Sequence, residues 1–287
     1  MESDLQLAVE EALDSAVVAS RRLGGGDVAM SFAVDLAAGR RVFAKTHADP
    51  PPGFFTTEAA GLGWLDASGS VRVPQVLAAS DGHDVPLLLL EWVEPGSPAG
   101  STEVELGRDL AGLHQGEWPT FGRPDRRTTG SRGLPNEPCE SWVDFFATQR
   151  LLPLARLATD AAALPDQVCA DLESVANRLE DLGGPPEAPS LLHGDLWAGN
   201  RLVDSGGDSW LIDPAAHGGH REFDLAMMRL FGGFGDACFA AYAEVYPLAP
   251  GWEDRIELHQ IAPLVVHAIK FGGSYVPAAT STIGRYR

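Results

Sequence analysis

The sequence predicts an α+β fold in two lobes, with a small N-terminal lobe built on an antiparallel sheet and a larger helical C-terminal lobe. Between residues 17 and 93, strand-like stretches alternate with turns rich in glycine and proline. Beyond these strands, apolar residues recur at helical spacing. The 287 residues are enough for two lobes, each with a core of its own. We therefore expect an N-lobe at 1–93, a linker at 94–97 and a C-lobe at 98–287.

Local patterns define the elements of the N-lobe. Ser3 and Gln6 fit a capping box, and apolar residues at helical spacing follow them, which predicts a helix over 4–15. The strict alternation from Val28 to Leu36 predicts a strand of an antiparallel meander. A second helix is expected to begin at Thr57. The predicted strands are 17–23, 28–36, 41–47, 73–77 and 87–93.

The C-lobe is expected to be mainly helical. Residues 115–138 are dense in Gly, Pro and Arg, which predicts a long surface loop. The last dozen residues, after Tyr275, are rich in Ser, Thr and Ala and are expected to be mobile. The predicted helices are 104–114, 142–157, 165–182, 223–231, 236–246 and 252–270.

Composition excludes several functional classes. A formal net charge of −19 argues against nucleic-acid binding, because phosphate contacts need a surplus of Lys and Arg. No apolar run reaches the roughly 20 residues of a membrane helix, and the acidic first residues differ from a signal peptide. We therefore expect a cytoplasmic protein that does not bind membranes. The 3 cysteines form no C-x-x-C pair, so neither a disulfide framework nor a zinc site is indicated.

One short motif carries most of the functional information. The segment H-G-D-L-W-A-G-N puts Asp195 and Asn200 in one loop. Two strand-like patches, 201–203 and 210–212, follow with a turn-rich link between them, and Asp213 comes directly after the second patch. A tight hairpin of this length returns the chain. We therefore expect the Asp213 carboxylate beside the Asn200 amide, with Asp195 nearby.

These side chains suit phosphoryl transfer. Mg²⁺ prefers oxygen ligands from side chains and nucleotide phosphates, and Asn200 and Asp213 offer them. Asp195 is then available to accept the proton of an attacking hydroxyl or to orient that hydroxyl. His193, in the same loop, is expected to brace it through hydrogen bonds. Asp and Asn are also common turn formers, but their occurrence in this order around a hairpin favours a catalytic loop.

Three stretches of the N-lobe are candidates for holding ATP. Lys45 on a strand and Glu58 on a helix are expected to form the ion pair that positions nucleotide phosphates. A glycine run could bring backbone N–H groups to the phosphates, although it could equally be a plain hairpin turn: Gly24, Gly25 and Gly26. The end of the last N-lobe strand is expected to offer main-chain groups to an adenine edge: Glu91, Trp92 and Val93.

Further side chains near the motif are candidates for the acceptor site. Trp197 lies inside the loop and either floors a pocket for a sugar or amine or packs in the core. Arg221 and Glu222 are expected to face the substrate. Asp224 is expected either to cap its helix or to tie down the catalytic loop.

Together these stretches resemble the fructosamine kinase family (ketosamine 3-kinases), relatives of the aminoglycoside phosphotransferases. The resemblance covers nearly the whole chain, and it implies a protein-kinase-like fold. It also implies transfer of phosphate from ATP, with Mg²⁺, to the 3-hydroxyl of a ketoamine. By position, Asp195 would accept the proton. Besides H-G-D-L-W-A-G-N, the resemblance rests on I-D-P-A at 212–215, G-G-H-R-E-F-D-L-A-M at 218–227, L-F-G-G-F at 230–234 and H-A-I-K-F-G-G-S-Y at 267–275.

The resemblance also implies partners and excludes one relative. The partners would be small ketosamines or glycated proteins, and loss of the unstable 3-phosphate adduct would deglycate them; we expect a monomer or weak dimer. Asp213 is followed by Pro214 and Ala215 rather than by Phe-Gly, which argues against a protein Ser/Thr kinase. Two alternatives stay open: another small-molecule kinase acting on an aminoglycoside, aminoalcohol or sugar, and an inactive nucleotide-binding pseudokinase.

Overall fold

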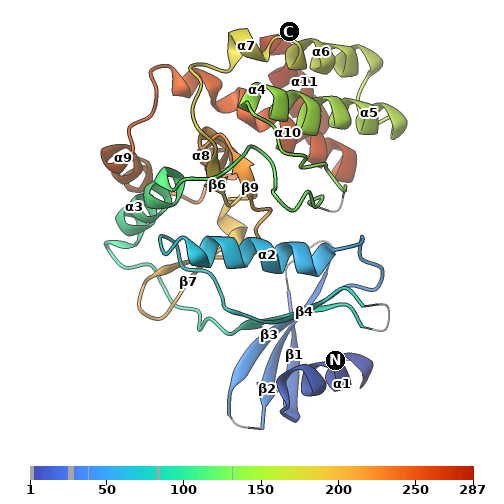
Figure 1. Ribbon diagram of the computed structural model, residues 1–287, viewed down its shortest axis with the longest axis vertical. Coiled ribbons are helices and arrows are strands. Elements are labelled where there is room, and N and C mark those ends of the chain that lie inside the picture. Colours follow the sequence, from blue (N-terminus) through green and yellow to red (C-terminus); the bar gives the residue numbers. More distant parts are fainter. Residues whose placement is uncertain (1–2, 25–28, 38, 83–84, 131) are drawn as a thin grey trace.

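The computed structural model describes residues 3–24, 29–37, 39–82, 85–130 and 132–287. It has the two lobes expected of an α+β chain, a small one with the sheet and a large helical one (Figure 1). In chain order, the small lobe holds α1 (Ser3–Leu13), β1 (Val17–Leu23), β2 (Met30–Leu36), β3 (Arg41–Thr46), α2 (Phe54–Ala67), β4 (Val76–Ser80) and β5 (Leu87–Glu91).

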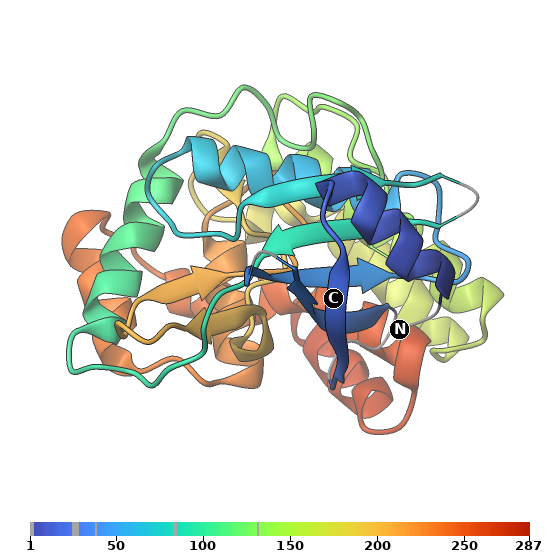
Figure 2. The same ribbon diagram turned by 90° about the horizontal axis from the view of Figure 1, so that it is seen from below.

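The small lobe is an antiparallel sheet of five strands in the order β1-β2-β3-β5-β4, with one helix on each face. Successive side chains of a strand point to opposite faces, so the leucine run of β5 serves both sides. Leu87 and Leu89 pack with α1, which lies in front of the strands when the molecule is seen from below (Figure 2). Leu88 and Leu90 pack on the other face, with α2.

Besides its helices, the described part of the large lobe holds two short strand pairs and a few isolated bridges. No helix in the described part of the chain has the length and apolar character that crossing a bilayer requires. Its elements are α3 (Thr102–Gln115), α4 (Trp142–Phe146), the π-helical turn η1 (Ala147–Leu151), α5 (Leu152–Asp160), α6 (Asp166–Ala176), α7 (Leu179–Leu182), β6 (Ser190–Leu192), the 3-10 turn η2 (Ala198–Asn200), β7 (Arg201–Val203), β8 (Ser209–Leu211), β9 (His217–Gly219), α8 (Glu222–Phe231), α9 (Asp236–Val245), α10 (Trp252–Phe271) and α11 (Tyr275–Tyr286).

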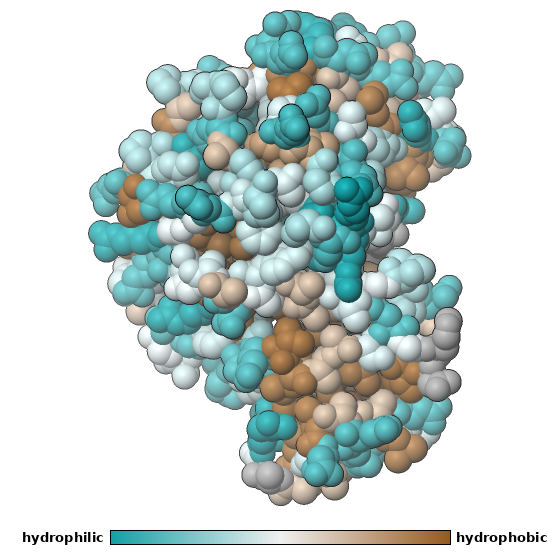
Figure 3. All heavy atoms as spheres, in the orientation of Figure 1, coloured by the Kyte–Doolittle hydropathy of each residue, from teal (hydrophilic) through white to brown (hydrophobic). Residues whose placement is uncertain are grey.

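The two lobes share a hydrophobic core. In Figure 1, α2 lies across the junction between the sheet and the large lobe. Leu62 of α2 belongs to the same buried cluster as Leu110 of α3 and Leu211 of β8. The space-filling view shows the surface drawn in between the lobes on its right-hand edge (Figure 3). Because apolar packing continues through the junction, it holds the catalytic hairpin in a fixed place beneath the sheet.

Two elements of the N-lobe begin three residues away from their predicted starts. The helix α2 begins at Phe54 rather than Thr57, because Gly53 turns the chain with φ 77° and the Asp81 carboxylate accepts the Phe55 N–H at 2.7 Å. The strand β4 begins three residues later than expected. The preceding stretch leaves the sheet, and the Arg72 carbonyl instead accepts the Leu211 N–H at 2.8 Å.

Of two predictions about irregular segments, one is wrong and the other is confirmed except for a few buried residues. The residues after Tyr275 form α11, with Ala279 and Ile283 fully buried in the core of the large lobe. Residues 115–138 are not a plain surface loop, because Arg123 and Asn136 are buried within them. Arg and Asn are mostly exposed in proteins, so composition alone favours the surface. Here hydrogen bonds compensate for the burial.

Candidate active site

The predicted hairpin of the catalytic motif is confirmed. The strands β7 and β8 pair antiparallel, with Arg201 opposite Leu211. The Ile212 N–H then donates to the Asn200 carbonyl at 3.0 Å. The chain therefore reaches Asp213 directly beside the end of the catalytic loop.

Asp195 is held at this loop by Asn200. The Asn200 side-chain nitrogen donates to the Asp195 carbonyl at 2.8 Å and to its carboxylate at 3.0 Å. Burial raises the pKa of Asp195 to about 6; the hydrogen bond from Asn200 opposes this rise and the negative charge of Asp213 adds to it. A carboxylate with a pKa near the working pH is suited to proton transfer.

Asp224 anchors the backbone of the same loop. Its buried carboxylate accepts the His193 N–H at 2.7 Å and the Gly194 N–H at 2.9 Å, and it lies 3.3 Å from His114 Nε2. Burial by itself would raise the pKa of Asp224, but hydrogen bonds from His114 and from the loop hold it below its ordinary value. The prediction that Asp224 ties down the catalytic loop is confirmed.

His193 braces the loop from within. Its Nε2 lies 3.0 Å from the Ile212 carbonyl, and its Nδ1 accepts the Asp195 N–H at 3.3 Å. Burial lowers the pKa of His193, so the ring is neutral and both nitrogens are used structurally. Gly194 has φ 82°, and a Cβ there would meet the Ala215 carbonyl oxygen at 2.2 Å. Only glycine lets the loop lie this close to the segment after Asp213.

The ion pair between Lys45 and Glu58 is also confirmed. Lys45 Nζ lies 3.0 and 2.9 Å from the two Glu58 carboxylate oxygens and 3.1 Å from Asp213 Oδ1. Burial by itself would lower the pKa of Lys45, but the two carboxylates raise it above its ordinary value. The Lys45 side chain is 10% exposed whereas that of Asp213 is 36% exposed. The Asp213 carboxylate therefore keeps an open side toward the cleft.

The strand end before the linker leaves the main-chain donors of Trp92 and Val93 without a partner among the described residues. The Glu91 N–H donates to the Gln75 carbonyl at 2.9 Å, whereas the Val93 N–H has no partner within the described ranges. The Arg41 guanidinium lies 5.5 Å from the centre of the Trp92 ring. Adenine binding at these residues stays a prediction. Of the predicted glycine run, Gly24 follows β1 and is exposed, and two positions lie outside the described residues: Gly25 and Gly26.

Trp197 lies on the surface and not in the core. Its side chain is 40% exposed, and its ring meets that of Phe231 edge-on with the ring centres 6.0 Å apart. Of the two alternatives left by the sequence, this placement excludes core packing. An exposed ring two residues after Asp195 is available to a substrate.

The expectation that Arg221 and Glu222 face the substrate is wrong. Both are buried, with 3% and 1% of their surface exposed. Arg221 binds the carboxylate of Glu187 at 2.7 and 2.9 Å. Glu222 accepts hydrogen bonds from Arg255 at 2.5 and 2.9 Å. Their polar atoms are used up inside the large lobe, so they have none left for a ligand.

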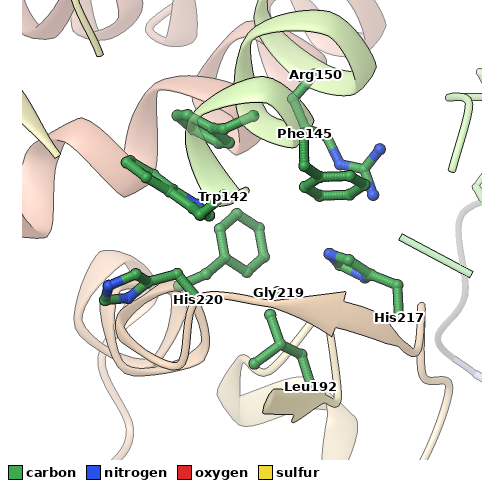
Figure 4. A pocket seen from close by; sticks show the side chains of 9 residues that line it. Trp142, Phe145, Arg150, Leu192, His217, Gly219 and His220 are labelled. Atoms are coloured by element: carbon green, nitrogen blue, oxygen red, sulfur yellow. The ribbon is translucent and has the colours of Figure 1, made fainter. Parts of the chain in front are cut away.

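A small cavity beside these residues is structural. Figure 4 shows His217 and His220 turned toward aromatic rings of α4 across a space of about 10 Å³, which holds one water molecule at most. Burial lowers the pKa of His217 to about 3 and that of His220 to about 4, so both rings are neutral. The cavity is too small and too enclosed for a sugar.

Sequence reasoning missed two groups of residues near the site. His114 supports Asp224 and lies 2.9 Å from the hydroxyl of Tyr242, through Nδ1. These residues come from α3 and α9, and no sequence signal links them. The second group consists of two further exposed rings, those of Phe231 and Phe271. A signal existed for these two, since both stand in stretches that carry the family resemblance.

The comparisons with known proteins agree on one family. The model of the fructosamine kinase family matches residues 1–287. The chain is 36% identical over 252 residues to a probable ketoamine kinase of Enterococcus faecium, covering 88% of this chain and 89% of that protein. It is 34% identical over 259 residues to a probable ketoamine kinase of Synechocystis sp., covering 89% and 85%.

Solved structures confirm the kinase-like fold. A candidate fructosamine-3-kinase from Thermobifida fusca superposes with a TM-score of 0.89 at 38% identity, over 98% of this chain and 97% of that one. The aminoglycoside phosphotransferase APH(4)-Ia shares the fold, with a TM-score of 0.65 at 16% identity over 98% and 97%. The two-lobed fold is thus kinase-like, and the chain belongs to the fructosamine kinase family.

Proposed function

We propose that the protein is an ATP- and Mg²⁺-dependent ketosamine 3-kinase whose product loses its sugar and so frees the amine. The observation that carries this proposal is the placement of Asp195. Its carboxylate is bonded by Asn200, its loop is fastened by Asp224, and its pKa is raised to about 6 by burial. Catalysis then rests on positioning and on charge neutralisation.

Asp195 is the proposed proton acceptor. The 3-hydroxyl oxygen of the ketosamine attacks the γ-phosphorus of ATP, the bond to the β-phosphate oxygen breaks, and ADP leaves. The hydroxyl proton passes to the Asp195 carboxylate. A pKa of about 6 leaves this group mainly ionised at neutral pH and still basic enough to take the proton.

The donor set of Asn200 and Asp213 fits Mg²⁺. Asn200 uses its side-chain nitrogen in bonds to Asp195, which leaves the amide oxygen as a ligand. Asp213 offers a carboxylate that is 36% exposed. Oxygen ligands of this kind suit Mg²⁺. When bound, the ion neutralises charge on the β- and γ-phosphate oxygens.

The N-lobe supplies the proposed nucleotide site. Lys45, fixed by Glu58, carries the positive charge for the phosphates. The unpartnered Val93 N–H and the Glu91 carbonyl are placed to meet an adenine edge.

A ketosamine suits the acceptor side better than a neutral sugar does. Its nitrogen is separated from the 3-hydroxyl oxygen by only three carbons, so it lies near Trp197 when that oxygen meets Asp195. The amine is protonated at neutral pH, and an exposed indole face attracts an ammonium group. The ketoamine kinases among the relatives support the same acceptor class.

The direct test is turnover of defined acceptors. The protein is incubated with ATP, Mg²⁺ and a free fructosamine or ribulosamine. ³¹P NMR follows a sugar 3-phosphate and then inorganic phosphate, and chromatography follows the free amine that is released with it. Aminoglycosides and choline are run in parallel. Phosphorylation of those compounds alone would favour the other small-molecule kinases. Nucleotide binding without transfer to any acceptor would indicate a pseudokinase.

A further inference from the structure

Exposed aromatic side chains gather beside the catalytic loop. Six large hydrophobic side chains are exposed in the described part of the chain. Three of them carry rings, namely Trp197 at 40%, Phe231 at 36% and Phe271 at 47%. The remaining three are single aliphatic residues elsewhere, at Leu7, Val18 and Val245. An exposed apolar patch on a soluble protein marks a binding site more often than isolated exposed residues do.

The exposed rings are linked into one surface by two further rings. Phe231 lies 6.0 Å from Trp197 and 5.2 Å from His267, measured between ring centres. His267 lies 5.5 Å from Phe271 and 4.9 Å from Tyr275. We call these five residues the ring surface. It joins the catalytic loop to the ends of α8 and α10 and to the start of α11.

Two helices end at this surface in the same way. Phe231 is the last residue of α8, and Gly232 and Gly233 follow it with φ 68° and 88°. Phe271 is the last residue of α10, and two glycines again follow with φ 62° and 56°, Gly272 and Gly273. Left-handed glycines stop a helix sharply. Each helix therefore ends on an exposed phenylalanine whose ring lies next to that of His267.

The ring surface is continuous with the reacting centre. Trp197 is two residues from Asp195 in the same loop. Lys270 Nζ lies 4.7 Å from the Phe271 ring centre, and its charge also reaches Asp195, whose pKa it lowers against the larger effect of burial. A molecule whose hydroxyl lies at Asp195 and which extends past Trp197 would therefore meet Phe231 and Phe271 next.

We propose that the ring surface binds the group carried by the acceptor nitrogen and selects ketoamines in which that group is aromatic or extended and apolar. This inference rests on the proposed ketosamine kinase function. With the 3-hydroxyl at Asp195 and the ammonium group at Trp197, the substituent on nitrogen points away from the phosphate donor. Phe231 and Phe271 then remove its apolar surface from water.

The test compares two acceptors that differ only in this group. The fructose ketoamines of phenylalanine and glycine share the sugar, the ammonium and the carboxylate. We expect kcat/KM to be at least about 10-fold higher for the phenylalanine adduct, since hydrophobic pockets discriminate by such factors. Calorimetric Kd values, measured with the Asp195→Asn variant, should show the same order without depending on turnover.

Variants of the ring surface test whether its side chains cause the preference for the phenylalanine adduct. Phe231→Ala and Phe271→Ala should each bring the phenylalanine-to-glycine ratio of Kd closer to one, whereas Phe231→Tyr should retain it because the ring remains. Val245→Ala removes an equally exposed side chain from α9 and serves as the matched control, with an unchanged ratio. All three positions are at the surface, so the four variants should fold.

The experiments distinguish failure of the ring-surface inference from failure of the proposed kinase reaction. Equal Kd values for the two adducts in the Asp195→Asn variant would overturn the ring-surface inference, even if both adducts are phosphorylated. Tighter binding of the phenylalanine adduct without any phosphate transfer by the native enzyme would support the surface and reject the proposed reaction. Loss of selectivity in Val245→Ala as well would also contradict the inference, because the effect would not belong to the rings.

Discussion

Two groups of buried charges in this protein make similar contacts but differ in their exposure to solvent. In the cleft, Lys45 binds Glu58 through both carboxylate oxygens and also touches Asp213. In the large lobe, Arg255 binds Glu222 through both carboxylate oxygens. The cleft group ends on a carboxylate that is 36% exposed, whereas Glu222 is 1% exposed. One group is open at one end and the other is closed.

The difference separates a ligand site from a structural network. Glu222 lies with His220 and His259 in a set of donor atoms within 4.8 Å of one another, a spacing that could suit a metal ion. The guanidinium of Arg255 already holds the carboxylate, so a metal cation would lie against another cation. Asp213 also contacts a cation, Lys45, but its carboxylate is 36% exposed and keeps an open side for a further cation.

The largest expected effect comes from the open end of the cleft group. Asp213→Asn removes the anionic ligand but keeps the shape, and we expect kcat/KM for ATP-dependent transfer to fall by about 10³-fold, or about 4 kcal/mol. Thermal unfolding should change little, because this side chain is partly exposed. Steady-state kinetics and calorimetry on one sample check both. Activity within 10-fold of the native value would show that Asp213 is no ligand.

A substitution in the closed network should lower the stability of the protein and leave its activity nearly unchanged. Glu222→Gln leaves Arg255 buried without its charge partner, and we expect a loss of about 3 kcal/mol in the free energy of unfolding. The kcat of the folded fraction should stay close to native. Urea denaturation and kinetics below the transition measure the two quantities. A large fall in kcat with unchanged stability would reverse our assignment of Arg221 and Glu222.

Acid should protonate the carboxylates of Asp195 and Glu222 at different pH. Asp195, with its pKa raised to about 6, becomes protonated as the pH falls through 6, and activity should then decrease about 10-fold per pH unit. Burial would raise the pKa of Glu222, but His259, whose Nε2 lies 3.4 Å from the carboxylate, and the hydrogen bonds from Arg255 lower it to about 2. Its contribution to stability is therefore present above pH 4.5 and is lost only toward pH 2.

Rate profiles and unfolding curves over the same pH range test this order. The buried neutral histidines add a separate loss of stability below pH 6.5, because the unfolded chain then binds protons that folded His217 and His220 do not. An acid limb of kcat/KM that lies near pH 4 would contradict the raised pKa of Asp195.

The smallest effect is expected behind the catalytic loop. Tyr242→Phe removes the hydroxyl that meets His114 and keeps the ring, so we expect about 1 kcal/mol less stability and a several-fold lower kcat. Tyr286→Phe removes a hydroxyl that donates to the Asp254 carbonyl at the far end of α11, and it is the control for stability alone. Equal kcat values in both variants would show that this support does not reach Asp195.

The sequence was sufficient where chemistry is encoded locally. The hairpin from Asn200 to Asp213 follows from spacing, and the pair of Lys45 and Glu58 follows from their order in an expected kinase-like chain. The helix α11 was missed because small residues dominate it, and only tertiary packing buries its Ile283. Local sequence does not report such long-range burial.

The roles of buried polar residues could not be predicted, because they depend on distant partners. Arg221 finds Glu187, and Glu222 finds Arg255, each more than thirty positions away. A charged residue near a catalytic motif looks the same in sequence whether its partner is a substrate or the opposite helix. His114 beneath Asp224 is a further case, with 110 positions between them.

The backbone at Asp213 has a consequence for how such an enzyme is governed. Its φ of 53° lies in the left-handed region, and Pro214 directly follows and is buried. A residue before proline has few conformations to choose from, so this carboxylate has no easy swing between an on and an off position, unlike the mobile activation segments of protein kinases. We therefore expect an enzyme that is not regulated by a conformational switch at Asp213. Its rate in the cell would then follow the concentration of its proposed ketoamine substrate.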